Sequence, residues 1–280
     1  MISLSVIDMI ALLCIVFIGL PHGAFDGALY ALLPSGERKA SLLRFLALYS
    51  LTALLIIGLW LVFPVISLLL FLAISAFHFG KGDTAGYQGK NRFIALIAHG
   101  GLVTMYLPFI HNKDAMAFFS YLTFRPADEL GLLAAILTLA AILWSACVLY
   151  YGYLAVTDRR YRRRFSEIIL AAILMAYLPL LPAFAFYFCA LHSARHFTSI
   201  YQALKTQAPR RLWPLAISLS VASWLAGGLT LLALLPYQDM VLSMIQILFI
   251  GLAALTVPHM ILVDGLWRPL FLANRKTDHG

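Results

Sequence analysis

The feature that most constrains this chain is its series of long apolar runs, several of which are long enough to cross a lipid bilayer. A membrane-spanning helix needs about 20 mostly apolar residues. Of the 280 residues, 62% are hydrophobic and only 11% are charged, whereas soluble domains carry about 25% charged residues. Only helices and closed barrels satisfy the backbone inside lipid. Because the apolar runs are continuous rather than alternating, the sequence predicts an all-α, polytopic integral membrane helix bundle, with one domain over residues 1–280.

The apolar runs predict about nine transmembrane helices. The first is expected to be a retained span rather than a cleaved signal, because it lacks a basic start and a small-residue cleavage site and contains Asp8. The predicted spans are 3–20, 44–62, 65–79, 93–110, 130–155, 166–179, 182–204, 213–235 and 240–262.

The distribution of lysine and arginine predicts how these spans are oriented. With alternating loops, 17 of the 20 basic residues fall on one side, 2 on the other and 1, Arg195, inside a span. The positive-inside rule places the basic side in the cytoplasm, so the N-terminus is expected outside and the C-terminus inside, in the cell (inner) membrane. The basic cytoplasmic loops then explain the net charge of +8, so no nucleic-acid partner is expected. The arginine-rich segment 158–164 is expected to rest on anionic lipid.

Five histidines are expected to meet near the cytoplasmic face. They lie toward the inner ends of the first, third, seventh and ninth predicted spans, all of which run in the same direction. These residues are His22, His78, His192, His196 and His259. A polar residue inside a span is costly and is by default a functional candidate. A lone histidine at a helix end is usually an interfacial residue. The hypothesis of a functional site therefore depends on the similar depth of all five histidines in the membrane.

These histidines predict a metal site. His192 and His196 are four residues apart, so they share one helix face and can bind one ion together. Neutral imidazole is the commonest ligand for transition metals, and helix bundles often hold metals between facing helices. An all-nitrogen site suits Zn, Cu, Fe or Ni, so the ligand type leaves the metal open. His99 is expected to be a packing residue or to line a substrate channel.

Aspartates follow three of these histidines by about one helical turn. They are Asp26, Asp83 and Asp264. Since a metal-bound histidine usually donates its other ring N–H to a carboxylate or carbonyl group, we expect each aspartate to hold its own histidine or a neighbouring one. The aromatic run 184–188 could line an apolar tunnel for a lipophilic substrate.

Four motifs together resemble one known family. They are Pro21-His22-Gly23-Ala24-x-Asp26, Phe77-His78-Phe79-Gly80-x-x-Asp83, His192-x-x-Arg195-His196 and Pro258-His259-x4-Asp264. They are similar to those of the Brp/Blh family of bacterial and archaeal membrane proteins, which are β-carotene 15,15′-dioxygenases that supply retinal to microbial rhodopsins. The resemblance extends from the first predicted span to the last.

The resemblance implies a non-haem Fe(II) enzyme that cleaves the central double bond of β-carotene with O2. It implies that His22, His78, His192 and His196 are the iron ligands. His259 is left as a fifth ligand, a residue that supports a ligand, or a group near bound oxygen. Asp26, Asp83, Asp264 and Arg195 are candidates for supporting roles around the site.

Two other classes of protein stay open at this point. One is another membrane metal oxidase, such as a desaturase or hydroxylase, although these usually have several close histidine pairs and this chain has one His-x3-His pair. The other is a metal transporter or a haem-binding membrane protein. A transporter should carry polar residues across the whole bilayer, whereas the polar cluster here is expected at one face.

Overall fold

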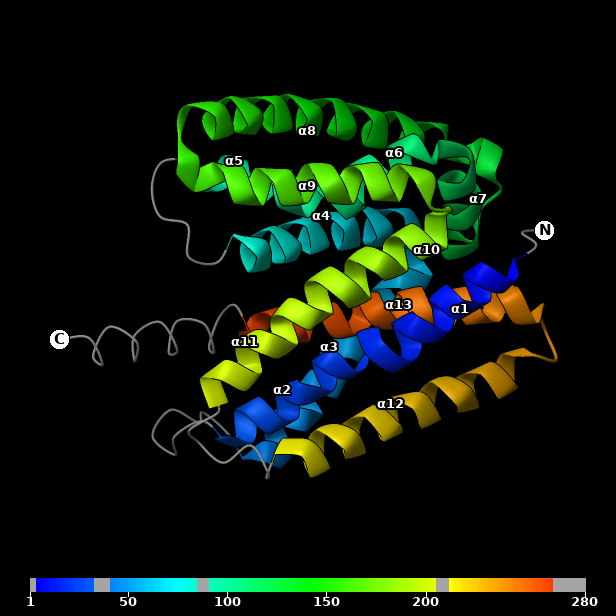
Figure 1. Ribbon diagram of the computed structural model, residues 1–280. Helices are drawn as coiled ribbons and strands as arrows, with labels where there is room; N and C mark the ends of the chain where they lie inside the picture. Colours follow the sequence, from blue (N-terminus) through cyan, green and yellow to red (C-terminus); the bar gives the residue numbers. More distant parts are fainter. Residues whose placement is uncertain (1–3, 33–40, 85–90, 205–211, 264–280) are drawn as a thin grey trace. The chain divides into compact units, whose positions relative to one another are not determined.

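Helices make up all the regular structure in the part of the chain that the structure describes. A computed structural model describes residues 4–32, 41–84, 91–204 and 212–263 (Figure 1). Among these described residues, seven helical segments are long and apolar enough to cross a membrane, which confirms a polytopic helical membrane protein. They are Val6–Ala31, Leu42–Val62, Pro64–Asp83, Arg92–Ile110, Ala127–Thr157, Trp213–Leu234 and Met240–Leu262.

The two other predicted spans are also helical but are not among these seven. Residues 166–179 fall largely in α9 (Arg159–Tyr177), which begins with a cluster of arginines. Residues 182–204 correspond to α10 (Leu180–Ala185), the π-helix η4 (Phe186–Ser193) and α11 (Ala194–Leu204). The count of nine spans, and the orientation of the termini, stay predictions.

Two predicted spans end later in the structure than the sequence suggested. The first was expected to end at residue 20, yet α1 (Val6–Cys14) and the π-helix η1 (Ile15–Gly19) are followed by α2 (Pro21–Leu32). The third continues to Asp83 in α4 (Pro64–Asp83). Hydropathy falls at Pro21 and at Gly80, but proline is tolerated in the first turn of a helix and glycine in a helix interior costs only about 1 kcal/mol. His78 therefore lies inside α4 rather than at its end, and His22 lies in the first turn of α2, within the longer apolar segment Val6–Ala31.

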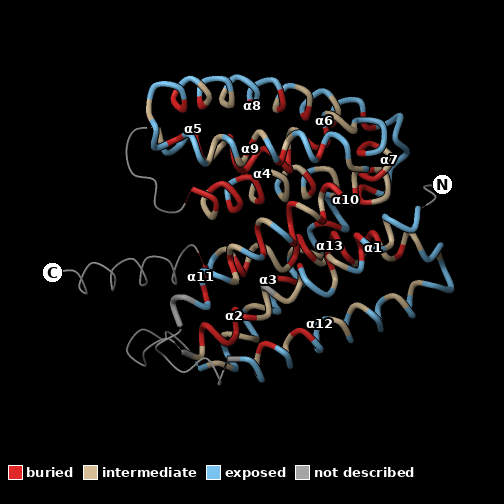
Figure 2. The backbone as a smooth tube through the Cα atoms, in the orientation of Figure 1, coloured by how far each residue is buried: buried red, intermediate tan, exposed pale blue. Residues whose placement is uncertain are grey.

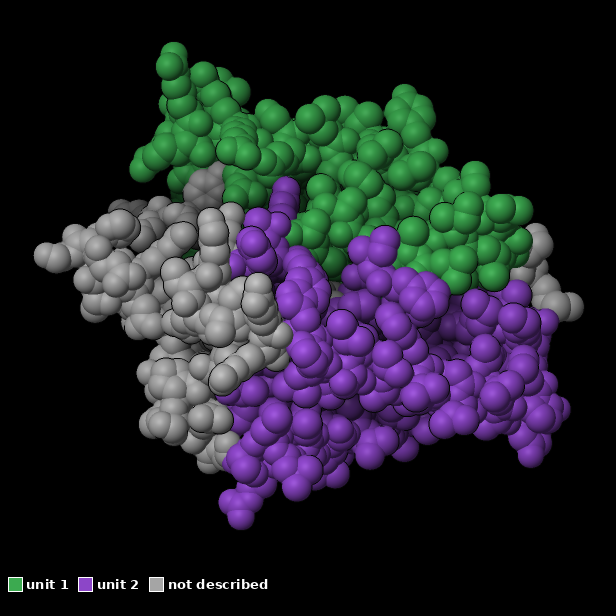
Figure 3. Space-filling model, turned by 60° about the horizontal axis from the view of Figure 1, so that its bottom comes forward, with its two compact units in different colours: residues 1–15, 64–194 green, residues 16–63, 195–280 purple. Residues whose placement is uncertain are grey.

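The chain forms two compact units (Figure 3). Unit 1 contains Met1–Ile15 and Pro64–Ala194, and unit 2 contains Val16–Phe63 and Arg195–Gly280. Each unit takes segments from both halves of the sequence. The expectation of one domain over residues 1–280 stays a prediction.

Unit 1 is a bundle in which helices close in the sequence pack side by side. In it α4 packs against α5 (Arg92–Gly101), α5 against α8 (Gly131–Thr157), and α8 against α9, which in turn contacts α10. The π-helix η2 (Leu102–Tyr106) and α6 (Leu107–Ile110) continue α5. The helix α7 (Asn112–Thr123) and the short 3₁₀ helix η3 (Ala127–Leu130) lead into α8.

The outer face of α8 shows how this unit meets its surroundings. Its coils alternate between buried and exposed along their length (Figure 2), and large apolar side chains such as Leu132, Leu139, Leu149 and Val156 are exposed. A soluble protein rarely exposes so large a contiguous apolar surface. A helix of this kind is solvated by lipid, which is what its composition predicted.

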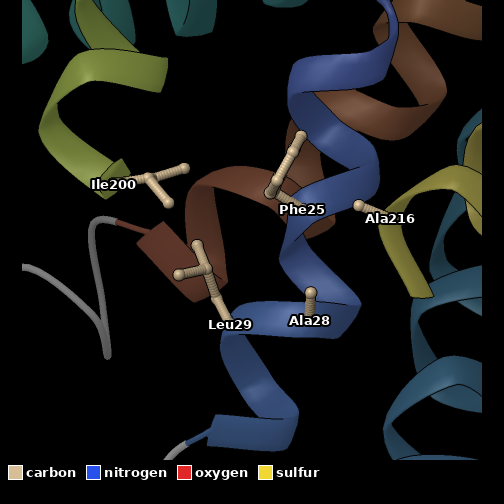
Figure 4. Packing of buried hydrophobic residues seen from close by; sticks show 5 residues of the cluster. All are labelled: Phe25, Ala28, Leu29, Ile200 and Ala216. Carbon is tan, nitrogen blue, oxygen red and sulfur yellow. The ribbon is translucent and has the colours of Figure 1, made fainter. Parts of the chain in front are cut away.

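Unit 2 is built from α2, α3 (Leu42–Val62), α12 (Leu212–Leu234) and α13 (Met240–Leu262), with α11 from Arg195 onward. In this unit α2 packs against α12, and α3 packs against α13. Phe25, Ala28 and Leu29 of α2 form a buried apolar cluster with Ile200 of α11 and Ala216 of α12 (Figure 4). This packing fixes the rotation of α2, which also carries Asp26.

Candidate metal centre

In unit 1, His78 and His192 are brought together as neighbours. His78 lies in α4 and His192 in η4, and both are almost completely buried. Their ring centroids are 5.0 Å apart with an interplanar angle of 68°. The ring of Phe79 lies 4.5 Å from that of His192, and the ring of Phe188 stacks on His192 at 6.1 Å. Two predicted ligands from different helices thus pack against the same aromatic side chain, Phe79.

A second polar group in unit 1 is centred on Asp83. The hydroxyl of Tyr187 donates a hydrogen bond to Oδ2 of Asp83 at 3.0 Å. Nδ1 of His99 lies 3.8 Å from the same oxygen, which is an ion-pair distance but too long for a hydrogen bond. His99 was expected to be a packing residue or to line a channel, and the structure places it beside this buried carboxylate.

In unit 2, His196 of α11 and His259 of α13 form a matching pair. Their ring centroids are 5.2 Å apart with an interplanar angle of 72°, and both rings are buried. The two rings are therefore neighbours, and the meeting of all five histidines around one ion stays a prediction.

Asp26 links three helices of unit 2. Both of its carboxylate oxygens lie 2.9 Å from Nδ1 of His259. The hydroxyl of Tyr49, in α3, donates to Oδ2 of Asp26 at 2.8 Å. An ionised carboxylate only accepts hydrogen bonds, so Nδ1 of His259 carries a proton and donates it to Asp26. Asp26 thus contacts a histidine of another helix, 233 residues away in sequence, and its support of a metal-bound histidine stays a prediction.

Close helix packing positions His78 and His99. A Cβ atom added at Gly80 would collide with the backbone carbonyl of Leu96, and one added at Gly100 would collide with that of Ala76. Small residues let membrane helices approach each other closely. Since Gly80 follows His78 by two residues and Gly100 follows His99 directly, the tight crossing of α4 and α5 sets where these rings lie.

Three π-helical segments lie next to the candidate histidines. The segment η1 (Ile15–Gly19) precedes His22, η2 (Leu102–Tyr106) follows His99, and η4 (Phe186–Ser193) contains His192. Short π-helical turns within α-helices often occur at functional sites, because the extra residue changes the direction of side chains. This local geometry supports a functional role for all three positions.

The remaining site predictions are not resolved by the described contacts. His22 lies in α2, one turn before Asp26, but its side chain is outside the described residues, and so is the whole of Asp264. Arg195 is half-buried in α11 and its supporting role stays a prediction. His192 and His196 belong to different units, so their sharing of one ion is also still a prediction.

Within each unit, the spacing of the two imidazole rings fits a pair of ligands to a transition metal. Two imidazoles bound to one ion at a metal–nitrogen distance of about 2.0–2.1 Å have ring centres about 4.5 Å apart at a right angle and about 5.2 Å apart at a tetrahedral angle. Both observed ring pairs, at 5.0 Å and 5.2 Å, fall in this range. Ordinary edge-to-face rings also pack at about 4.5–7 Å, so the separations are compatible with a shared ion without requiring one. Among the residues described within each unit, no group of three or more His, Cys, Asp or Glu side chains is close enough to hold a metal ion.

Sequence reasoning missed Tyr49, and it placed Tyr187 only in the aromatic run 184–188 without foreseeing its contact with Asp83. Each donates its hydroxyl to a buried aspartate, Asp26 or Asp83. The only signal in the sequence was a hydroxyl group within a predicted span, 44–62 or 182–204, and tyrosine is common in membrane helices as an interface anchor.

Comparison with known proteins extends over nearly the whole chain. The sequence model of a family described as Beta-carotene 15,15′-dioxygenase matches residues 13–267. A curated relative, the Beta-carotene 15,15′-dioxygenase of uncultured marine bacterium 66A03, is 40% identical over 269 residues, which are 95% of this chain and 96% of the relative. No solved structure matches the chain. On both the family match and the full-length identity, this chain belongs to the β-carotene 15,15′-dioxygenase family.

Proposed function

We propose that this protein cleaves the central 15,15′ double bond of β-carotene with O2 and releases two molecules of retinal. In this reaction the carbon–carbon double bond breaks and each half of the polyene gains one oxygen atom, so one O2 accounts for both aldehydes. The observation that carries the proposal is the match to the dioxygenase family over residues 13–267, a range that includes all five histidines of the predicted site.

The proposed cofactor is Fe(II), held by His22, His78, His192 and His196. The support for this set is the chemistry of buried imidazoles, since His78, His192 and His196 are each less than a tenth exposed. Neutral imidazole binds iron well, and a polar ring inside a membrane helix is costly and is by default a functional candidate. When bound, the iron would supply the centre at which O2 and the polyene react.

The protein's own residues would orient the substrate and exclude water. Phe79 and Phe188 pack around His192 and would present an apolar surface to a polyene beside the imidazoles. Asp26 keeps a proton on Nδ1 of His259, and Tyr187 holds Asp83. These carboxylates would offset the positive charge of a metal centre at short range.

The proposed location is the inner cell membrane, with the site toward the cytoplasm. The support is the strong asymmetry of basic residues between alternate loops. A lipophilic carotenoid would reach the site from the surrounding lipid, and the retinal produced would be available to a membrane protein such as a microbial rhodopsin.

The direct test is expression in cells that accumulate β-carotene. We expect the orange colour to fade while retinal accumulates, measured by chromatography of extracted pigment. The matched control is His111→Ala, because His111 is a histidine outside the proposed site whose ring contacts the backbone carbonyl of Met175. Unchanged β-carotene with normal amounts of wild-type protein in the membrane would contradict the proposal.

A further inference from the structure

Among the described residues, the proposed iron ligands leave two buried histidines, His99 and His259, and His259 packs against a proposed ligand of its own unit. His259 lies in α13, and its ring packs against that of His196 at 5.2 Å. This is the same kind of contact that joins His78 and His192 at 5.0 Å. The pair in unit 1 consists of two proposed ligands, whereas the pair in unit 2 contains only one.

The surroundings of His259 fix which ring nitrogen carries the proton. Both oxygens of Asp26 lie 2.9 Å from Nδ1, so Nδ1–H donates to the carboxylate. In the neutral ring the lone pair is then on Nε2. A carboxylate paired with the Nδ1–H of a histidine is the arrangement that metalloproteins use to orient a ligand and raise its basicity.

Asp26 is held in turn by Tyr49. The hydroxyl of Tyr49 donates to Oδ2 of Asp26 at 2.8 Å and lies 3.3 Å from the backbone carbonyl of Leu255, one turn before His259 in α13. Asp26 is only 1% exposed. A carboxylate this deeply buried is retained at a high cost in desolvation, and the three groups come from three different helices. A purely structural link between helices would not need an ionisable pair beside a second imidazole.

We infer that His259 is a further metal ligand that binds through Nε2, and that Asp26 and Tyr49 are its positioning residues. This inference rests on the proposed metal site. Asp26 fixes the tautomer and the direction of the ring, and Tyr49 fixes Asp26 against α13. The same contacts explain why an aspartate lies within the helical segment Pro21–Leu32 rather than in a loop.

The test measures metal binding by the full-length apoprotein in detergent, with Co(II) as a spectroscopic probe. Its visible absorption reports the number and geometry of ligands, independently of turnover. We expect His259→Ala to change the Co(II) spectrum. Asp26→Asn should keep that spectrum but weaken affinity about 10–100-fold, as for other residues that support metal ligands. Tyr49→Phe should weaken affinity less than Asp26→Asn does.

Two matched variants control for general effects. His111→Ala removes an imidazole that contacts a backbone carbonyl, and Tyr106→Phe removes a hydroxyl that donates to the carbonyl of Ala172. Both should leave the Co(II) spectrum and affinity at wild-type values. Thermal unfolding of each apoprotein separates loss of fold from loss of ligand.

Three results would overturn the inference, and they differ from a failure of the proposed function. An unchanged Co(II) spectrum in His259→Ala, with wild type binding the metal, removes His259 from the ligand set alone. If His259→Ala does not fold, Asp26→Asn and Tyr49→Phe decide the matter. Unchanged Co(II) affinity in both of these variants also removes His259 from the ligand set. A wild-type protein that binds neither Co(II) nor Fe(II) ends both this inference and the proposed iron site.

Discussion

A Tyr–Asp–His arrangement occurs at the residue scale in both units. Tyr49 donates to Asp26, which accepts from His259, and Tyr187 donates to Asp83, which lies 3.8 Å from His99. Inside lipid a carboxylate must be compensated by donors or by cations. The tyrosine hydroxyl supplies one such donor to each aspartate.

The proposed ligands should be individually essential. His78→Ala and His192→Ala are each expected to lose bound iron and retinal formation together, because removing one imidazole opens the coordination shell of the ion. Iron content of purified protein by elemental analysis and retinal by chromatography are the two measurements. Near-normal turnover in either variant would remove that residue from the ligand set, and His111→Ala serves as the histidine control.

The hydrogen bond of Tyr187 to Asp83 should contribute measurably to stability. Tyr187→Phe removes a donor to a charged group, and both residues are almost completely buried. Hydrogen bonds to charged groups contribute about 1.5–3 kcal/mol in soluble proteins, whereas those between membrane helices average about 0.6 kcal/mol. We expect a loss of about 1–2 kcal/mol in unfolding free energy in mixed detergent micelles. Tyr106→Phe, which loses a bond to a neutral carbonyl, should lose less, and an equal loss in both would contradict this account.

At the scale of elements, the crossing of α4 and α5 depends on two glycines. Gly100→Ala is expected to separate these helices, because its Cβ would collide with the carbonyl of Ala76. Overpacking of this kind costs about 1–3 kcal/mol, and retinal formation should fall as His78 and His99 move. Unfolding in mixed micelles and pigment analysis are the measurements.

Gly58→Ala in α3 is the matched control for this substitution. A Cβ there would meet nothing within 4 Å, so the variant should be neutral or slightly more stable, by up to about 1 kcal/mol, as expected for Gly→Ala in a helix. Equal destabilisation by both substitutions would show that helix crossing is not the cause.

Hydropathy predicted which segments are helical better than it predicted where they end. In the part of the chain that the structure describes, seven helical segments are long and apolar enough to span a membrane. The continuation through Pro21–Leu32 was not predicted, because glycine, proline and aspartate lower the local hydropathy while the backbone can remain helical. The helix Asn112–Thr123 was also missed, since Lys113 and Asp114 make its start resemble a loop.

The candidate site was predictable as a set of histidines but not as a set of contacts. His22, His78, His192, His196 and His259 were selected from their position within predicted spans. Which aspartate faces which histidine depends on the rotation and tilt of helices far apart in the sequence. Asp26 and His259 are one such pair. The π-helical segments and the two tyrosines depend on the same tertiary packing, for which a single sequence carries no periodic signal.

At the scale of the whole molecule, the distribution of charge predicts the orientation in the membrane. With 17 of 20 basic residues on alternate loops, the C-terminus should lie in the cytoplasm. A green fluorescent protein fused to the C-terminus should fluoresce, and an alkaline phosphatase fused at the same point should be inactive. Active phosphatase would show that the C-terminus lies outside the cytoplasm. The predicted topology would then be inverted, and the proposed site would lie toward the other leaflet.

The central claim is that imidazoles from separate helices hold one iron. X-ray absorption at the iron edge, on protein purified without oxygen and loaded with Fe(II), tests this most directly. The account predicts one iron per chain, with a first shell of nitrogen and oxygen atoms. It also predicts the multiple-scattering signal of several imidazoles, and this signal should be weaker in His78→Ala and His192→Ala. A folded protein that binds no iron, or an iron spectrum with sulfur or porphyrin neighbours, would contradict it.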